Sequence, residues 1–224
     1  MSTFVLLHGA FRGGWAWQRV RPLLVAAGYD VHAPTLSGSA AGLDDWVDQV
    51  AWLIESEDLD DVVLVGHSQG GVVVREVALR LPERLDHVVY VDAAVPDPGE
   101  RAVDLGPAPP VLPPRETQIP PRPLVPGGDL DETTAQWLNA RLTATPFAPS
   151  LDPVSTAVPG VPATYAFCSG TPDGYPSQTT RARLDERGVS YETLDAGHDA
   201  PLTAPALVAD LLLRVATDEQ HKEQ

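Results

Sequence analysis

The stretch that decides the fold is Val62-Val63-Leu64-Val65-Gly66-His67-Ser68-Gln69-Gly70-Gly71-Val72-Val73-Val74. Its first four aliphatic residues predict a buried strand, G-x-S-x-G follows, and the residues after Gly70 are compatible with a helix. This order is typical of a nucleophile elbow, in which a strained strand-to-helix turn holds a serine hydroxyl exposed. Glycines suit the turn because two backbones come close there and a Cβ would clash. We therefore predict that Ser68 is a nucleophile.

Strand and helix patterns alternate on both sides of this stretch. Such alternation indicates βαβ units and a mostly parallel sheet covered by helices on its faces, which is the α/β class. The apolar runs predict further strands at residues 4–7, 29–33, 88–91, 163–168 and 191–194. Helical patterns predict helices at residues 15–27, 43–55, from the elbow to about 81, 177–187 and 203–215.

The alternation stops between residues 96 and 162, where 16 of the 23 prolines lie. Proline fits neither regular helix nor central strand, so only residues 132–141 predict a helix in this segment. Its scattered apolar residues favour a small packed lid, with a floppy insert over residues 106–128 as the alternative. We expect a core formed by residues 1–95 and 163–217, the lid at 96–162 and a frayed polar tail at 218–224.

The amino-acid composition limits which binding partners and which cellular compartment are expected. The 224 residues carry a formal net charge of −16, which argues against binding to nucleic acid or to an anionic membrane. No apolar stretch is long enough to span a bilayer, and no secretion signal is visible at the N-terminus. The single cysteine, Cys168, excludes an intrachain disulfide and suggests no metal site. We expect a cytoplasmic monomer or homodimer without metal or cofactor.

A serine nucleophile needs a general base, and the base needs an acid that orients it. His198 lies between the last predicted strand and the last helix, where this type of fold places its base. The acid should follow a strand between the serine and the histidine. Asp173 is our first choice and Asp92 the alternative, with Asp97 and Asp195 weaker. The other histidines lie in turns, on strands or in the tail: His8, His32, His67, His87 and His221.

An oxyanion hole requires two backbone amides that converge on one oxygen. One is expected from Gln69, directly after the nucleophile. The other is expected from the loop after the first strand, from Ala10, with Phe11 as an alternative. The predicted lid should shape an apolar substrate pocket, for which the candidate walls are aromatic: Phe11, Trp15, Trp137 and Phe147.

Four segments together resemble a known group of proteins: residues 4–17, 66–70, 89–93 and 196–198. They are similar to the plant methylesterase and hydroxynitrile lyase branch of the α/β hydrolases and to its bacterial esterase relatives. The resemblance implies an α/β-hydrolase fold, a Ser-His-Asp triad, a small cap, compact ester substrates and no cofactor. The segment from Cys168 to Asp173 departs from the family pattern, because the acid there usually lies closer to the strand end. Asp92 therefore stays open as the acid.

Two positions bear on the reaction type within this branch. The lyases have a threonine after the first-loop histidine and a lysine after the catalytic histidine, where this chain has Gly9 and Asp199. A carboxylate would oppose departing cyanide, so the chain resembles the esterases. The leading hypothesis is a serine carboxylester hydrolase acting on small, largely apolar esters. The alternatives are thioester or lactone hydrolysis, lyase-type cleavage, and a non-catalytic ligand receptor.

Overall fold

A six-stranded, wholly parallel sheet forms the centre of the protein in the computed structural model, which describes residues 2–107 and 111–222. The strand order β2-β1-β3-β4-β7-β8 confirms the predicted α/β-hydrolase fold. Each strand matches a predicted apolar run: β1 (Thr3–Leu7), β2 (Asp30–His32), β3 (Val62–His67), β4 (Leu85–Val91), β7 (Ala163–Cys168) and β8 (Glu192–Leu194).

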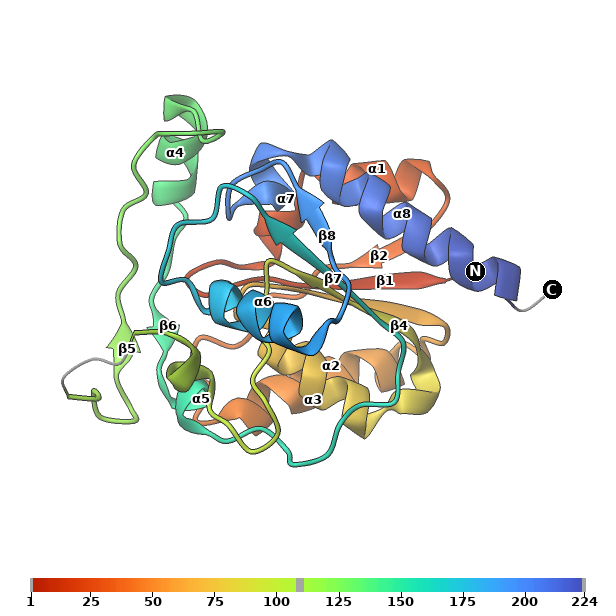
Figure 1. The fold of residues 1–224 in the computed structure, drawn as a ribbon, viewed down its shortest axis with the longest axis horizontal. Coiled ribbons are helices and arrows are strands. Elements are labelled where there is room, and N and C mark those ends of the chain that lie inside the picture. The colour runs from red at the N-terminus through yellow and green to blue at the C-terminus, as the bar shows by residue number, and fades with distance from the viewer. Residues whose placement is uncertain (1, 108–110, 223–224) are drawn as a thin grey trace.

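Helices cover both faces of the sheet (Figure 1). On one face lie α1 (Arg21–Ala26) and α8 (Pro205–Lys222), and on the other α2 (Leu43–Ser56), α3 (Gly70–Arg80) and α6 (Pro176–Arg187). Side chains alternate along β1, so Val5 and Leu7 join one hydrophobic cluster while Phe4 and Leu6 join the other. Both clusters exclude solvent, which explains why the strands are continuously apolar in sequence.

Two predicted helices are interrupted at prolines. The helix expected over residues 15–27 is a 3₁₀ helix (Gly14–Trp17) followed by α1, which begins with Pro22 in its first turn. The helix expected from 203 to 215 begins earlier, as the short α7 (Ala200–Thr203), and restarts at Pro205 as α8. Proline disfavours helical geometry in the residue before it, which places the break at Ala204. Because α8 continues to Lys222, the expected polar tail starts inside a helix; residues 223–224 lie outside the described part.

The segment 96–162, called the insertion below, crosses the carboxyl end of the sheet and then runs back to the start of β7 (Figure 1). Its α4 (Glu132–Asn139) confirms the one predicted helix and is capped by the Asp131 carboxylate. Contacts within the described part favour the packed lid over the floppy alternative, because β5 pairs with β6 and Arg115 binds Asp152; residues 108–110 lie outside the description. The remaining elements are short: a 3₁₀ helix (Ala102–Leu105), β5 (Gln118–Ile119), β6 (Thr145–Pro146) and α5 (Ala148–Leu151).

The chain order reverses beside β1, and this topology locates the site. β2 pairs with one edge of β1 and β3 with the other, so the loops after β1 and β3 leave the sheet side by side. Crevices at such a switch point, beyond the carboxyl ends of the strands, are where α/β sheets bind ligands. The stretch that begins with His8 and the turn at Ser68 therefore face the same space.

Candidate active site

Ser68 occupies the strained turn that the sequence predicts. Its φ is +52°, in the left-handed region that non-glycine residues rarely adopt. A Cβ on Gly66 would come within 2.7 Å of Val74, and one on Gly70 within 2.8 Å of the Leu7 carbonyl oxygen. The close contact of β3, α3 and β1 thus requires both glycines and fixes Ser68 at the carboxyl end of the sheet.

Three side chains form a continuous hydrogen-bonded chain at this turn. Ser68 Oγ lies 3.0 Å from Nε2 of His198, and Nδ1 of His198 lies 2.5 Å from Oδ2 of Asp92. His198 is 7% exposed and Asp92 is fully buried, so bulk water does not compete for these bonds. With Nδ1 donating to the carboxylate, Nε2 is free to accept the serine proton, which is the geometry of a general base and its nucleophile.

The carboxylate that the structure places on His198 is that of Asp92, the alternative, and not that of Asp173, the first choice. β4 pairs directly with β3, and Asp92, with φ +43°, follows β4 at the level of Ser68. Asp173 lies in an exposed turn after β7, one strand further out, and makes no hydrogen bond to His198. The weaker candidates bind elsewhere: Asp97 pairs with Arg187, and Asp195 accepts from Ser169.

The loop after β7 contributes to the acid in another way. The Thr171 hydroxyl donates to Oδ2 of Asp92, and the Cys168 amide lies 3.4 Å from Oδ1. Burial by itself would raise the pKa of Asp92, but the hydrogen bonds from His198 and Thr171 outweigh it and lower that pKa below its ordinary value. Asp92 is therefore held as a carboxylate. Sequence reasoning missed Thr171, because nothing in the sequence marks a threonine as a partner of a distant acid.

Removal of the Thr171 hydroxyl should lower the reaction rate but leave the arrangement of Ser68, His198 and Asp92 in place. In Thr171→Val, Asp92 loses a charge-assisted hydrogen bond, and kcat for the ester hydrolysis that we propose below should fall roughly tenfold. Thr171→Ser keeps the hydroxyl and should stay within about threefold of the wild type. Steady-state kinetics on one activated ester compares the variants, and equal loss in both would mean that side-chain packing, not the hydrogen bond, matters at this position.

The two amides expected to form an oxyanion hole lie at the start of α3 and in the loop after β1. Gln69 directly precedes the first residue of α3, and Gly9 is packed so closely that a Cβ on it would lie 2.7 Å from the Ser68 Cβ. Ala10 follows Gly9 and lines the same cavity as Ser68 and Gln69. The alternative donor, the Phe11 amide, already donates to Thr145 Oγ1 at 2.6 Å, which favours Ala10.

Two buried histidines support the loops around the site. Nδ1 of His8 donates to the Gly9 carbonyl and its Nε2 accepts the Leu36 amide, which fits only the neutral ring. His67 Nε2 donates to the His198 carbonyl at 2.7 Å, and its ring lies 4.8 Å from the His198 ring. Burial lowers the pKa of His8 to about 4, and burial together with His198 lowers that of His67 to about 3. Both rings are therefore neutral in the folded protein at pH 7.

These two histidines should make the fold sensitive to mild acid. Below about pH 6.5 the unfolded chain binds protons at His8 and His67, whereas the folded chain does not. The free energy of unfolding therefore decreases as the pH is lowered. The expected loss approaches about 1.4 kcal/mol per pH unit for each histidine between about pH 6 and pH 4. Urea unfolding at several pH values measures the slope, and His8→Asn should make it shallower. A flat profile from about pH 7 to pH 5 would contradict the assignment.

A buried ion pair flanks His198. Arg12 binds Asp199 through Nε at 2.8 Å and Nη2 at 2.6 Å, and its Nη1 donates to the Ala10 carbonyl at 2.9 Å. Burial would raise the pKa of Asp199, but Arg12 outweighs it and holds that pKa below its ordinary value. Asp199 is therefore an ion-paired carboxylate whose charge Arg12 balances. Arg12 was missed, because a lone arginine in a glycine-rich loop carries no pattern that predicts its partner.

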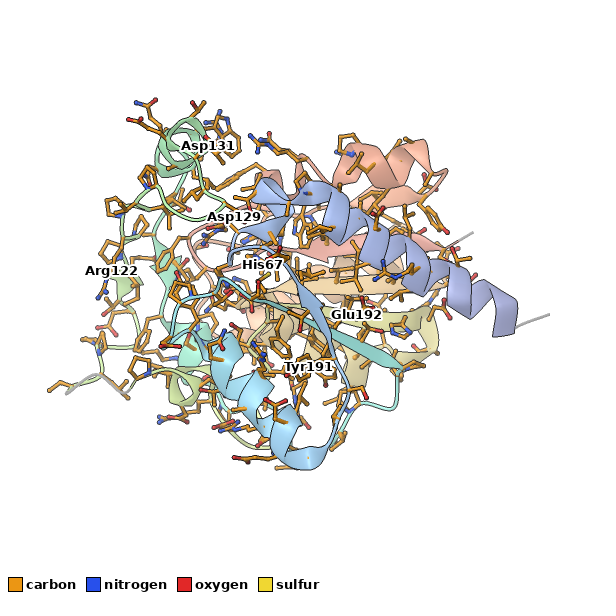
Figure 2. The ribbon with its side chains drawn as sticks, turned by 45° about the horizontal axis from the view of Figure 1, so that its top comes forward. His67, Arg122, Asp129, Asp131, Tyr191 and Glu192 are labelled. Atoms are coloured by element: carbon orange, nitrogen blue, oxygen red, sulfur yellow. The ribbon has the colours of Figure 1, made fainter. Side chains whose placement is uncertain are left out.

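The insertion contacts the histidine loop through Asp129 (Figure 2). Its Oδ2 accepts the Gly197 amide at 2.7 Å and the Thr203 hydroxyl at 2.6 Å. Gly197 directly precedes His198, so the insertion and the loop that carries the imidazole are joined by hydrogen bonds on the outer side. Nothing in the sequence linked Asp129 to this loop.

A cavity of about 720 Å³ opens above Ser68 and His198 between the core and the insertion. Of the four aromatic wall candidates, only Phe11 lines it. Trp15 and Trp137 pack edge to face at 5.5 Å, and Arg141 covers Trp137, so these rings stabilise the insertion instead; Phe147 is also outside the lining. Aliphatic and proline side chains of the insertion supply most of the apolar wall: Ile119, Pro120, Pro123, Leu124, Val125, Leu130 and Leu142.

Within residues 2–107 and 111–222, no three histidine, cysteine or acidic side chains are grouped so as to hold a metal ion. No helix in the same part of the chain combines the length and apolar character needed to cross a membrane. Cys168 is 1% exposed at the end of β7, and burial raises its thiol pKa, so it packs as a buried strand residue.

Comparison with known proteins gives partial and full-length matches. A 123-residue alignment to the carbendazim hydrolyzing esterase of a Nocardioides species is 42% identical and covers 51% of this chain and 50% of that protein. Salicylic acid-binding protein 2 of Nicotiana tabacum is 38% identical over 104 residues, which cover 42% of this chain and 40% of that protein. The chain thus spans half or less of the length of these curated relatives.

At the level of the fold the match extends over the whole chain. An extracellular alpha/beta-hydrolase from a Paenibacillus species superposes with a TM-score of 0.77 at 22% identity, covering 96% of this chain and 99% of that one. A sequence model described as the alpha/beta hydrolase family matches residues 4–211. Since that model covers nearly the whole chain, and the elbow and sheet order agree with it, the protein belongs to the alpha/beta hydrolase family.

Proposed function

We propose that the protein is a serine carboxylester hydrolase that cleaves small, largely apolar esters through an acyl-enzyme. The observation that carries the proposal is the chain of hydrogen bonds from Ser68 through His198 to Asp92, at 3.0 Å and 2.5 Å. A hydroxyl on a strained turn, a buried imidazole and a buried carboxylate are the parts that acyl transfer requires.

The first half of the reaction forms the acyl-enzyme. Ser68 Oγ attacks the ester carbonyl carbon while His198 Nε2 accepts its proton, and Asp92 stabilises the resulting imidazolium through Nδ1. The carbonyl oxygen becomes an oxyanion, which accepts hydrogen bonds from the Gln69 and Ala10 amides. The positive end of α3 points at the same oxygen. Collapse of the tetrahedral intermediate breaks the ester C–O bond, and His198 protonates the leaving alkoxide.

The second half releases the acid. His198, neutral again, accepts a proton from a water molecule that attacks the acyl carbonyl, and the same two amides stabilise the second oxyanion. Collapse of this intermediate breaks the bond to Ser68 Oγ, which recovers its proton from His198. None of these proposed reaction steps uses a metal or a cofactor.

The cavity supports the proposed substrate class. Its volume of about 720 Å³ suits a compact molecule, and its wall from the insertion is mostly aliphatic and proline. The insertion thereby acts as the lid over Ser68. The names of the sequence relatives, a carbendazim hydrolyzing esterase and several methylesterases, agree with an ester substrate.

A panel of p-nitrophenyl and naphthyl esters of graded acyl length tests the proposal. We expect turnover that depends on Ser68, with the best kcat/KM for short or compact acyl groups. Matched oxygen esters, thioesters and lactones, together with a cyanohydrin, separate the alternative chemistries by their relative rates. Tight binding of a ligand with at most one slow turnover would instead indicate a receptor that uses the hydrolase fold.

A further inference from the structure

The geometry points to the Arg12–Asp199 ion pair as a positioning device for the reaction: it joins the loop that presents the Ala10 amide to the loop that carries His198, and as a pair it adds no net charge beside the imidazole. This inference rests on the proposed ester hydrolysis. Arg12 reaches both loops at once, with two nitrogens on Asp199 and one on the Ala10 carbonyl. Asp199 is the residue after His198, so its anchoring also restrains the imidazole.

Because the ion pair is buried, its contribution to the stability of the fold is expected to be small. Arg12 and Asp199 are each 9% exposed, and both line the cavity beside His198. The desolvation of two buried charges offsets much of their attraction, so an apolar pair of similar volume often serves stability equally well. A contribution that an apolar pair could not make would explain two charges at this depth. Joining two reactive loops is such a contribution, since the oxyanion amide and the base must hold a fixed distance during acyl transfer.

The charges around His198 show why neutrality matters. The ring faces the Asp92 carboxylate from the end of β4, the neutral His67 ring from β3 and the Tyr175 ring at 4.4 Å from the loop before α6. Asp199 and Arg12 complete this environment from the loops after β8 and β1. With the ion pair intact, Asp92 is the charge that bonds directly to the imidazole, at Nδ1, while the Asp129 carboxylate of the insertion lies against the Gly197 amide of the same loop.

Three variants separate positioning from charge. Asp199→Asn leaves the guanidinium uncompensated, so the acid limb of the kcat/KM profile should move about 0.5 pH unit lower. Arg12→Lys keeps the charge and should leave that limb in place, but it cannot span both loops, and kcat should fall about 10- to 100-fold. The double variant Arg12→Met with Asp199→Leu removes both charges; it should fold stably, keep the wild-type limb and still lose kcat by a similar factor.

Arg214→Met, which breaks the exposed pair with Glu192 on the core (Figure 2), is the matched control and should behave as the wild type. Thermal unfolding confirms that each variant is folded before its kinetics are compared. Folded Arg12→Lys and double variants with kcat within about threefold of the wild type would overturn the inference. If the wild type itself neither hydrolyses esters nor reacts at Ser68, it is the proposed function that fails.

Discussion

Ser68→Ala is expected to lower kcat for ester hydrolysis by about 10⁵- to 10⁶-fold, because the nucleophile and its base act as one unit. The residual rate should come from the Ala10 and Gln69 amides and the cavity, which bind the substrate without the covalent step. The variant should fold normally, since the change removes one hydroxyl oxygen, whose hydrogen bond is to His198. Steady-state rates on an activated ester and a thermal unfolding curve measure both expectations.

Ser190→Ala provides the matched control. Ser190 lies in an exposed loop before β8, 122 positions after Ser68 in the sequence. Its loss should leave kcat unchanged. Full activity in Ser68→Ala would show that Ser68 is not the nucleophile. Equal losses of kcat in both variants would show that the loss comes from the preparation of the protein and not from the missing hydroxyl of Ser68.

Asp92→Asn is expected to lower kcat by about 10⁴-fold while the structure stays intact. The carboxylate accepts the His198 Nδ1 proton at 2.5 Å, whereas an amide can present an N–H there and leave the imidazole in the wrong tautomer. Nε2 would then carry a proton and could not accept one from Ser68. Because Asp92 is fully buried, the isosteric asparagine is a better test than alanine, which would leave a cavity.

Asp173→Asn tests the alternative directly. Asp173 lies in an exposed turn, so its substitution should leave kcat within about threefold of the wild type. The two aspartates follow neighbouring strands of one sheet, β4 and β7, which makes them a matched pair. A large loss in Asp173→Asn together with full activity in Asp92→Asn would reverse the assignment of the acid.

The turn at Ser68 and the position of the proposed base, His198, were predictable from sequence because both depend on local order. An aliphatic strand, two glycines around Ser68 and a following helix can be read along the chain, and the structure gives Ser68 the positive φ that this turn implies. His198 was identified by its place between the last strand and the last helix. The structure confirms the proximity of the two side chains.

The choice between Asp92 and Asp173 required information that is not local. Both follow an apolar strand, and only the lateral order of strands shows that β4, not β7, adjoins β3. The signal in favour of Asp92 was its position directly after a fully apolar run, which predicts a buried carboxylate in need of a partner. Asp173, followed by Gly174, has the composition of an exposed turn.

The residues that line the cavity and the Arg12–Asp199 pair could not be predicted from the sequence either, because they too depend on contacts between distant segments. Trp15 and Trp137 lie 122 positions apart and contact each other, which no periodicity reveals. The insertion has little regular structure, so its apolar residues show that it packs without showing which of them face the cavity. Arg12 and Asp199 meet because the loops after β1 and β8 lie at the same end of the sheet.

Covalent labelling tests the central claim most directly. A fluorophosphonate forms a stable bond only with a hydroxyl that a neighbouring base has activated. We expect a single adduct per chain, mapped by peptide mass spectrometry to Ser68, no adduct in Ser68→Ala and much slower labelling in His198→Ala. A folded sample that hydrolyses esters yet carries no adduct on Ser68 would contradict the account.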